Sequence, residues 1–419
     1  MKNRYDLIVV GGGFAGVAAA ITAARQGTDV LLIERFNGLG GAAVNGLVMP
    51  FMKFWSPVAD SEEKTFLCGD LFLEIVERMR PFVPEDTRIT RFDEEVLKLV
   101  LNRMALESGV QLLFNTVVTE AKVENGAICS VKAWGKSREM EFFADRFIDA
   151  TGDAELATMA GVPSQVGRET DGLCQPMTLC FRLSGVDKEL YLQNKPSINP
   201  LYDEFRRAGK LKNPRENVLI FDNMNDGVLH FNTTRVVKRD PTDPFDVTIA
   251  EIEAREQVFE MLAFLKENFP CFRNARVLST SLQIGIRESR KIEGEYTLTV
   301  EDLKSLARFE DAIAVANYDI DIHNPEGAGT SHYYFDPGDW YQIPYRCLLP
   351  KKLNNLLVAG RCISSTHEAQ ASYRIMPYCC ELGQAAGQAA ALASQGKCNF
   401  KEIDVSALQE ALRKAGFLI

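Results

Sequence analysis

The stretch DLIVVGGGFAGVAAAITAARQG, residues 6–27, decides the fold of this chain. An apolar run that predicts a strand stops at three glycines, and an alanine-rich pattern typical of a helix begins beyond Gly16. The spacing G-x-G-x-x-G falls on Gly11, Gly13 and Gly16. Gly11 permits a tight turn, Gly13 lets the backbone approach a pyrophosphate, and Gly16 lets the helix pack closely on its strand. Because the helix N-terminus offers unpaired N–H groups and a positive dipole end, the unit predicts a dinucleotide site.

A second apolar strand is expected over residues 29–33, and it ends at Glu34. A carboxylate at that place can accept hydrogen bonds from the hydroxyl groups of an adenosine ribose. An ordinary glycine-rich turn is the alternative, but it does not account for the acid that follows the second strand. A continuous NAD-binding half would show further alternation of strands and helices immediately downstream. This chain continues with another glycine-rich loop instead.

Composition limits the class of protein and its partners. The chain has 419 residues, 46% of them hydrophobic, and a formal net charge of −10, which suits a soluble protein of two domains and disfavours nucleic acid or anionic membranes as partners. The apolar N-terminal run matches neither a signal peptide nor a membrane span, so we expect a cytoplasmic protein. The ten cysteines include no C-x-x-C pair and no zinc or iron–sulfur spacing, so no metal site and no redox-active disulfide are predicted.

The predicted fold class is α/β, with a Rossmann-like cofactor-binding domain, a β-meander and an inserted mixed α+β substrate domain. The cofactor domain would comprise residues 1–160 and 345–419, with a helical excursion over 59–108, because glycine-rich turns recur at both ends of the chain. The substrate domain would comprise residues 161–344, with short β-prone runs and one long helix over 247–268. Strands before the inserted part are expected at residues 110–114, 117–123, 127–134, 140–143 and 146–149.

Several further motifs carry a resemblance to a known family. They are LGGAA (39–43), DATGDAELA (149–157), GIRESRKIEGEYTLT (285–299), YQIPYRCLLP (341–350), NLLVAGRCIS (355–364) and THEAQASYRIMPYCCELGQAAGQAAALA (366–393). In their order and spacing they resemble the glutathione-reductase-type FAD oxidoreductases, and more narrowly the broad family of FAD-dependent oxidoreductases. The resemblance covers nearly the whole chain and implies FAD as the cofactor.

The resemblance also implies which residues hold the cofactor. The first turn and the acid after the second strand would hold the ADP part, and the following loops would flank the cofactor. The last glycine turn and the helix after it would reach the isoalloxazine, with backbone near Ile375 and Met376 stabilising charge on its pyrimidine edge. The implied cofactor-binding residues are Gly11, Gly13, Phe14, Ala15, Gly16, Glu34, Arg35, Gly40, Gly41, Ala42, Val118, Ala150, Thr151, Gly152, Gly360, Arg361, Arg374, Ile375 and Met376.

The sequence also bears on flavin attachment and electron supply. Residues 38–46 contain no histidine or cysteine, so noncovalent FAD is expected. A flavoenzyme that takes electrons from NAD(P)H in its own nucleotide domain shows a second G-x-G-x-x-G unit, which this chain lacks. We therefore expect an unidentified electron donor or acceptor besides a small-molecule substrate.

Histidines and arginines near the expected cofactor elements are the candidates for catalysis. His367 and His332 could move a proton near neutral pH, although a lone histidine is more often a structural hydrogen bonder. His367 is the first candidate, because it belongs to the motif that begins THEA and lies between Gly360 and the helix expected from Pro377. Arg287 could bind a substrate carboxylate bidentately or take part in a surface network with Glu288. Asp319, Asp321 and His323 alternate as metal ligands can, but plain strand alternation explains them equally, and we favour that interpretation.

Three functions fit the sequence. The first is an FAD-dependent oxidoreductase that transfers a hydride between flavin N5 and a small polar organic substrate, by CH–OH or CH–NH oxidation or by C=C reduction. The second is an FAD-binding subunit or non-redox flavoprotein whose chemistry depends on a partner. The third is a thiazole-synthase-like enzyme, against which the long middle segment counts.

Overall fold

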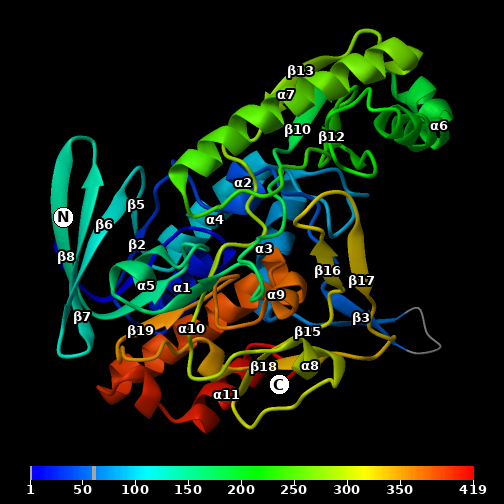
Figure 1. Ribbon diagram of the computed structural model, residues 1–419. Coiled ribbons are helices and arrows are strands. Elements are labelled where there is room, and N and C mark those ends of the chain that lie inside the picture. The colour runs from blue at the N-terminus through cyan, green and yellow to red at the C-terminus, as the bar shows by residue number, and fades with distance from the viewer. Residues whose placement is uncertain (1, 59–62) are drawn as a thin grey trace.

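The computed structural model describes residues 2–58 and 63–419, and its largest element is a seven-stranded sheet (Figure 1). Strands β5, β2, β1, β8 and β19 are parallel to their neighbours, and β8, β7 and β6 form an antiparallel meander at one side. The strands span Arg4–Val10 (β1), Val30–Ile33 (β2), Gln111–Leu113 (β5), Val117–Glu124 (β6), Ala127–Gly135 (β7), Arg138–Asp149 (β8) and Leu356–Val358 (β19). The predicted α/β fold with a parallel sheet and a meander is confirmed.

One long strand, β8, replaces two that the sequence predicted. Residues 140–143 and 146–149 were expected as separate strands, and the structure joins them within Arg138–Asp149. The alternation of buried and exposed side chains continues through the junction, since Ala144 is buried and Asp145 is exposed and bonded to Arg4. The first half of β8 pairs with β7 and the second half pairs with β1 and β19. The meander is therefore a direct continuation of the parallel sheet.

Two helices from opposite ends of the chain pack against each other beside this sheet. They are α1 (Phe14–Arg25) and α10 (Met376–Gly396), and both are mostly buried. Gly383 faces α1 so closely that a Cβ there would lie 2.0 Å from the carbonyl oxygen of Ala15, and one at Gly387 would lie 2.3 Å from that of Ala19. The expected close approach of the last helix to the N-terminal unit is thus present.

The helical excursion begins later than the sequence predicted. A short hairpin of β3 (Trp55–Pro57) and β4 (Lys64–Phe66) precedes it, and residues 59–62 lie outside the described residues. The helices that follow are α3 (Asp70–Met79), the short η1 (Arg80–Phe82) and α4 (Glu94–Glu107). The residues of this hairpin pair through their backbones, and the first helix after it begins only at Asp70.

Apart from the main core around α1 and α10, the structure has a second hydrophobic core, to which the long helix α7 contributes. This helix lies at the top of the molecule in Figure 1. It is formed by buried residues between Met177 and Ile284. They come from a four-stranded antiparallel sheet, two long helices and the segments that connect them. These elements are β10 (Phe181–Ser184), α6 (Lys188–Arg207), β11 (Ile220–Asp222), β12 (Leu229–Phe231), α7 (Pro244–Asn268), η2 (Pro270–Phe272) and β13 (Arg276–Thr280). Helix α6 was not predicted, because Pro196 and Pro200 interrupt its sequence pattern.

After β13 the chain returns to the main hydrophobic core, which lies around α1 and α10. Side chains from Leu298 to Leu349 pack there together with those of α1 and α10. The remaining elements are α2 (Ala42–Asn45), α5 (Glu155–Met159), β9 (Ser164–Val166), β14 (Arg290–Ile292), α8 (Val300–Lys304), β15 (Ala312–Ala316), β16 (Ile320–His323), β17 (Thr330–Tyr333), β18 (Tyr341–Pro344), η3 (Tyr345–Cys347), α9 (His367–Tyr373), η4 (Phe400–Glu402) and α11 (Val405–Lys414). The division into domains at residues 160 and 345 stays a prediction.

The helices of the described residues do not meet the requirements of a membrane span. No helix within 2–58 and 63–419 combines the length and the apolar character that crossing a bilayer requires.

Candidate functional site

The first turn forms a cradle whose glycines have separate structural roles. Gly11 adopts a φ of +101°, and a Cβ there would lie 2.5 Å from the carbonyl oxygen of Ala150. A Cβ at Gly16 would lie 1.8 Å from the carbonyl oxygen of Gly11, so this glycine is needed for packing the helix on its strand. At Gly13 the nearest atom to a Cβ would be the Cα of Gly41, 3.9 Å away. The space over Gly13 is therefore open on the cavity side.

The start of α1 faces this open space. Gly13 is the N-cap residue and no side chain caps the helix, while Phe14 and Ala15 of its first turn line the cavity. An uncapped helix N-terminus attracts anionic groups such as a pyrophosphate. The cradle fits the phosphates of a dinucleotide.

Glu34 closes the other side of the turn. Its carboxylate is 5% exposed and accepts hydrogen bonds from the backbone N–H groups of Gly12 (2.5 Å) and Phe36 (2.8 Å). These bonds hold it at the end of β2 on the cavity wall. A carboxylate has further lone pairs, so hydrogen bonds to ribose hydroxyls remain open to it.

Most of the residues implied by the resemblance line one continuous cavity, the first cavity. Those residues are Gly11, Gly13, Phe14, Ala15, Glu34, Arg35, Gly40, Gly41, Ala42, Val118, Ala150, Thr151, Gly152, Gly360, Arg361, Arg374 and Met376. Gly16 lies behind the wall, where it serves packing, and Ile375 lines a second cavity. The first cavity is also lined by residues that were not predicted from the sequence to bind the cofactor, namely Phe36, Asn45, Asp153, Glu155 and the segment 283–286.

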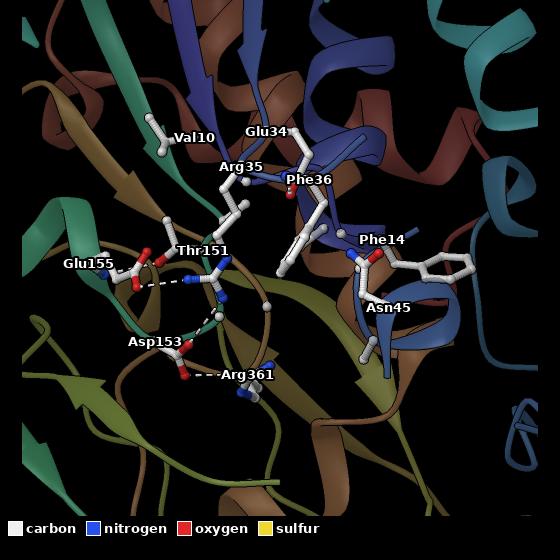
Figure 2. A pocket seen from close by; sticks show the side chains of 18 of the residues that line it. Val10, Phe14, Glu34, Arg35, Phe36, Asn45, Thr151, Asp153, Glu155 and Arg361 are labelled. Atoms are coloured by element: carbon white, nitrogen blue, oxygen red, sulfur yellow. Dashed lines mark hydrogen bonds and ion pairs between the residues drawn. The ribbon is translucent and has the colours of Figure 1, made fainter. Parts of the chain in front are cut away.

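A polar cluster holds the loop after β8 against the last glycine turn (Figure 2). Asp153 accepts a hydrogen bond from Arg361 at 2.6 Å and lies 4.0 Å from Arg35, which also pairs with Glu155 at 3.1 Å. Burial by itself raises the pKa of Asp153, but Arg361, Ser289 and Arg35 hold it below its ordinary value. Asp153 is thus an anion that fixes two arginines on the cavity wall. In the sequence, the one sign of this role is an acidic residue directly after the glycine of the motif DATGDAELA.

A second cavity adjoins the first. Both are lined by Ala42, Gly285, Ile286, Arg361, Arg374 and Met376, so the two spaces share one wall. The second cavity lies between residues 42–52, the four-stranded sheet and the β16–β17 hairpin. Its wall is partly apolar, with Val48, Met49, Leu219, Phe221 and Ile375, and partly charged.

The strand pair β16–β17 places Asp321, His323 and His332 together in the wall of the second cavity. Asp321 Oδ2 lies 3.3 Å from His323 Nε2, and Asp321 Oδ1 lies 3.7 Å from His332 Nδ1. His323 Nδ1 lies 3.0 Å from a nitrogen of Arg235, which can only donate, so Nδ1 is the acceptor and Nε2 carries the proton. Burial, followed by Arg287, lowers the pKa of His323 to about 3. His323 is therefore a neutral donor to Asp321.

Asp321 stays ionised in this setting. Burial raises its pKa, but His323, Arg374 and Arg287 together hold it well below the ordinary value. Its Oδ1 has no hydrogen-bond partner and faces His332, whose side chain is 35% exposed. No group of three or more His, Cys, Asp or Glu side chains placed to hold a metal ion occurs in the described part of the chain.

Arg287 also lines the second cavity, whereas His367 lines neither. The N–H groups of Arg287 donate to the carbonyl oxygen of Pro176 at 2.7 Å and to Thr178 Oγ1 at 2.6 Å. His367 is 3% exposed at the start of α9, with Nδ1 2.7 Å from a carboxylate oxygen of Glu288. The structure thus brings Arg287 and His332 together and places His367 in a separate buried cluster.

Fold and site together fit a dinucleotide-dependent enzyme, with a second cavity beside the one that fits the dinucleotide. The family model described as "FAD dependent oxidoreductase" matches residues 6–412. The chain belongs to this family of flavoenzymes, and its cofactor is FAD.

Curated relatives match over part of their length. A digeranylgeranylglycerophospholipid reductase of Methanocella arvoryzae is 35% identical over 182 residues, which is 40% of this chain and 42% of the relative. The corresponding reductase of Methanosarcina acetivorans is 24% identical over 62% of this chain and 63% of the relative. This chain therefore spans between about two fifths and two thirds of the length of such relatives.

A solved structure supports the fold. A geranylgeranyl bacteriochlorophyll reductase-like protein from Thermoplasma acidophilum superposes with a TM-score of 0.50 at 14% identity, over 98% of this chain and 84% of that protein. At this identity the likeness concerns the fold alone.

Flavin attachment can be checked directly. Cys379 is the one thiol among the described residues that lines the first cavity, and burial raises its pKa to about 12, so it is a poor nucleophile. We expect acid or heat to release all yellow pigment as FAD into the supernatant, identified by chromatography. Pigment that stays with the precipitated protein would instead demonstrate a covalent link.

Proposed function

We propose that this enzyme, in an architecture of the glutathione-reductase type, transfers a hydride between FAD and a small polar organic substrate bound in the second cavity. The shared wall of the two cavities supports this most directly, because a ligand in the second cavity would adjoin a cofactor in the first. Among the candidate reactions we favour C=C reduction, in line with the names of the reductases above. CH–OH or CH–NH oxidation is the alternative.

The cofactor would be held by the first turn, Glu34 and the loops around Gly41 and Gly152, which fit it as described. When bound, FAD supplies the two-electron redox chemistry. Met376 at the start of α10 lines both cavities, and the uncapped N-terminus of this helix would stabilise negative charge beside it.

His332 is the proton carrier in this proposal. Its ring reaches from the partly exposed side of the hairpin toward the ionised Asp321, whose free oxygen lies 3.7 Å from Nδ1. A carboxylate in this position orients an imidazole. His332 can therefore hold a proton at the wall of the second cavity and exchange it with solvent.

An anaerobic reaction panel tests the proposed function. Oxidised enzyme is mixed with candidate alcohols and amines, photoreduced enzyme with candidate alkenes, and the flavin spectrum is followed by stopped flow. At least one class should change the flavin redox state in a saturable manner. If no class does so until a second protein is added, the chain acts as an FAD-binding subunit and the proposal is wrong.

The same instrument tests electron supply. We expect NADH and NADPH to reduce the flavin slowly and without saturation, because the chain carries one dinucleotide fingerprint. Fast saturable reduction by either nucleotide would reveal a nucleotide site that lacks the motif.

A further inference from the structure

We propose that the second cavity binds an organic acid, and that Arg215 and Arg287 hold its carboxylate group. This inference rests on the proposed function, since it names the class of substrate for the same cavity. It comes from the charges on the cavity wall and from the partners that each charge already has.

Most charged groups around the cavity are neutralised by the protein. Arg235 lies 3.2 Å from Glu216, Arg361 lies 2.6 Å from Asp153, and Arg374 lies 3.6 Å from Asp321. Arg215 and Arg287 line the same cavity, and neither has a carboxylate oxygen within 4.0 Å among residues 2–58 and 63–419. The cavity wall therefore carries an excess of positive charge.

Arg215 shows most clearly that the cavity wall lacks negatively charged partners for its arginines. The residue is 3% exposed, its Nε donates to Asn217 Oδ1 at a long 3.4 Å, and its Nη1 has no hydrogen-bond partner. A buried charge without an oppositely charged partner costs free energy, and a bound anion would supply that partner.

Arg287 is held rigidly and faces the same space. Its Nη1 donates to Pro176 and Thr178, and its Nη2 reaches Asn232 Oδ1 only at 3.4 Å. Burial, followed by the positive charges of Arg215 and Arg374, lowers its pKa to about 9. A bound anion would relieve this repulsion and accept the hydrogen bonds that the two guanidinium groups can still donate.

The rest of the wall favours an organic acid over an inorganic anion. Val48, Met49, Leu219 and Phe221 provide apolar surface beside the arginines, which suits the hydrocarbon part of a ligand. Inorganic phosphate has no hydrocarbon part to cover this apolar surface, so a carboxylate with a hydrocarbon chain fits the wall better.

Equilibrium binding to the FAD-loaded protein tests the inference without turnover. Crotonate, sorbate and cinnamate are each titrated against their own amides, and inorganic phosphate is titrated separately, all at constant ionic strength with calorimetry as the readout. At least one carboxylate should bind about 10-fold or more tightly than its amide, because hydrogen bonds to a charged group contribute about 1.5–3 kcal/mol. Equal binding of every acid and amide, or tighter binding of phosphate, would overturn the inference.

Matched variants assign the effect to residues. Arg215→Gln and Arg287→Gln should each weaken carboxylate binding about 10- to 100-fold and leave amide binding unchanged, whereas the lysine variants should recover part of the affinity. Arg346→Gln is the control, since Arg346 pairs with Asp311 outside both cavities. Loss of FAD from the glutamine variants, seen in the ratio of flavin to protein absorbance, would assign the arginines to the cofactor and refute the inference.

The two proposals fail separately. Carboxylate binding without any redox change in the panel would leave the anion site standing and refute the oxidoreductase reaction on small substrates. Saturable flavin turnover by neutral substrates alone would keep the reaction and refute the anion site. If the glutamine variants do not fold, the acid and amide titrations on the parent protein still decide.

Discussion

Gly13→Val is expected to yield a folded but colourless protein. Its backbone lies in the extended region (φ −71°, ψ −177°), which valine adopts readily, and a Cβ there has only the Cα of Gly41 within 4 Å. The branched side chain would project into the open space of the first cavity, where the pyrophosphate would lie. The flavin-to-protein absorbance ratio after purification should fall to background, while far-ultraviolet circular dichroism stays as in the parent.

Two comparison variants make this result specific. Gly327→Val places the same side chain in open space away from both cavities and should retain FAD. Gly16→Val should instead impair folding, because its Cβ would collide with the backbone of Gly11. Normal FAD content in Gly13→Val would contradict the assignment of the cofactor to the first turn.

His332→Gln is expected to retain FAD and slow the substrate-driven change of the flavin spectrum by roughly 10²-fold, the lower range for loss of general acid–base help. Stopped-flow traces of the flavin spectrum give the measurement. The physical reason is the position of the ring between solvent and the unpartnered oxygen of Asp321.

His367→Gln is the matched control, and it separates two assignments. The sequence alone made His367 the first candidate for the proton relay. In the structure it pairs with Glu288, which also lies 2.7 Å from Lys291. Weakening this buried cluster should lower the free energy of unfolding by about 1–3 kcal/mol with little effect on the flavin reaction. A slow His367 variant beside a fast His332 variant would restore the original assignment.

The N-terminal unit was predictable because its chemistry is local. A strand, three glycines, a helix and an acid within one short stretch fix both the turn and its ligand, and Gly11, Gly13 and Glu34 lie where that pattern placed them. Helix α6 was not predicted because local sequence was the only guide. Pro196 and Pro200 disfavour a helix locally, and tertiary packing stabilises it nevertheless. The continuity of β8 depends on pairing with β1 and β7, which local spacing does not contain.

The second cavity was less predictable because distant segments build it. Arg215 stands in a stretch with no periodic pattern, and its burial beside Arg287 exists only after the four-stranded sheet has formed. The alternation of Asp321 and His323 was visible, but strand alternation alone does not tell which face borders a cavity. The preference for His367 over His332 rested on the motif that begins THEA and on its place between Gly360 and Pro377, and a place along the chain does not give position in space.

The glycines of α10 also bear on how the protein is made. Gly383 and Gly387 bring this helix into backbone contact with α1, so the N-terminal cradle gains its buried support only when residue 387 and its neighbours are present. During synthesis the first turn leaves the ribosome long before its supporting helix exists. We therefore expect stable loading with FAD only after residues 383–387 have emerged, and early termination products should carry the fingerprint without retaining the flavin.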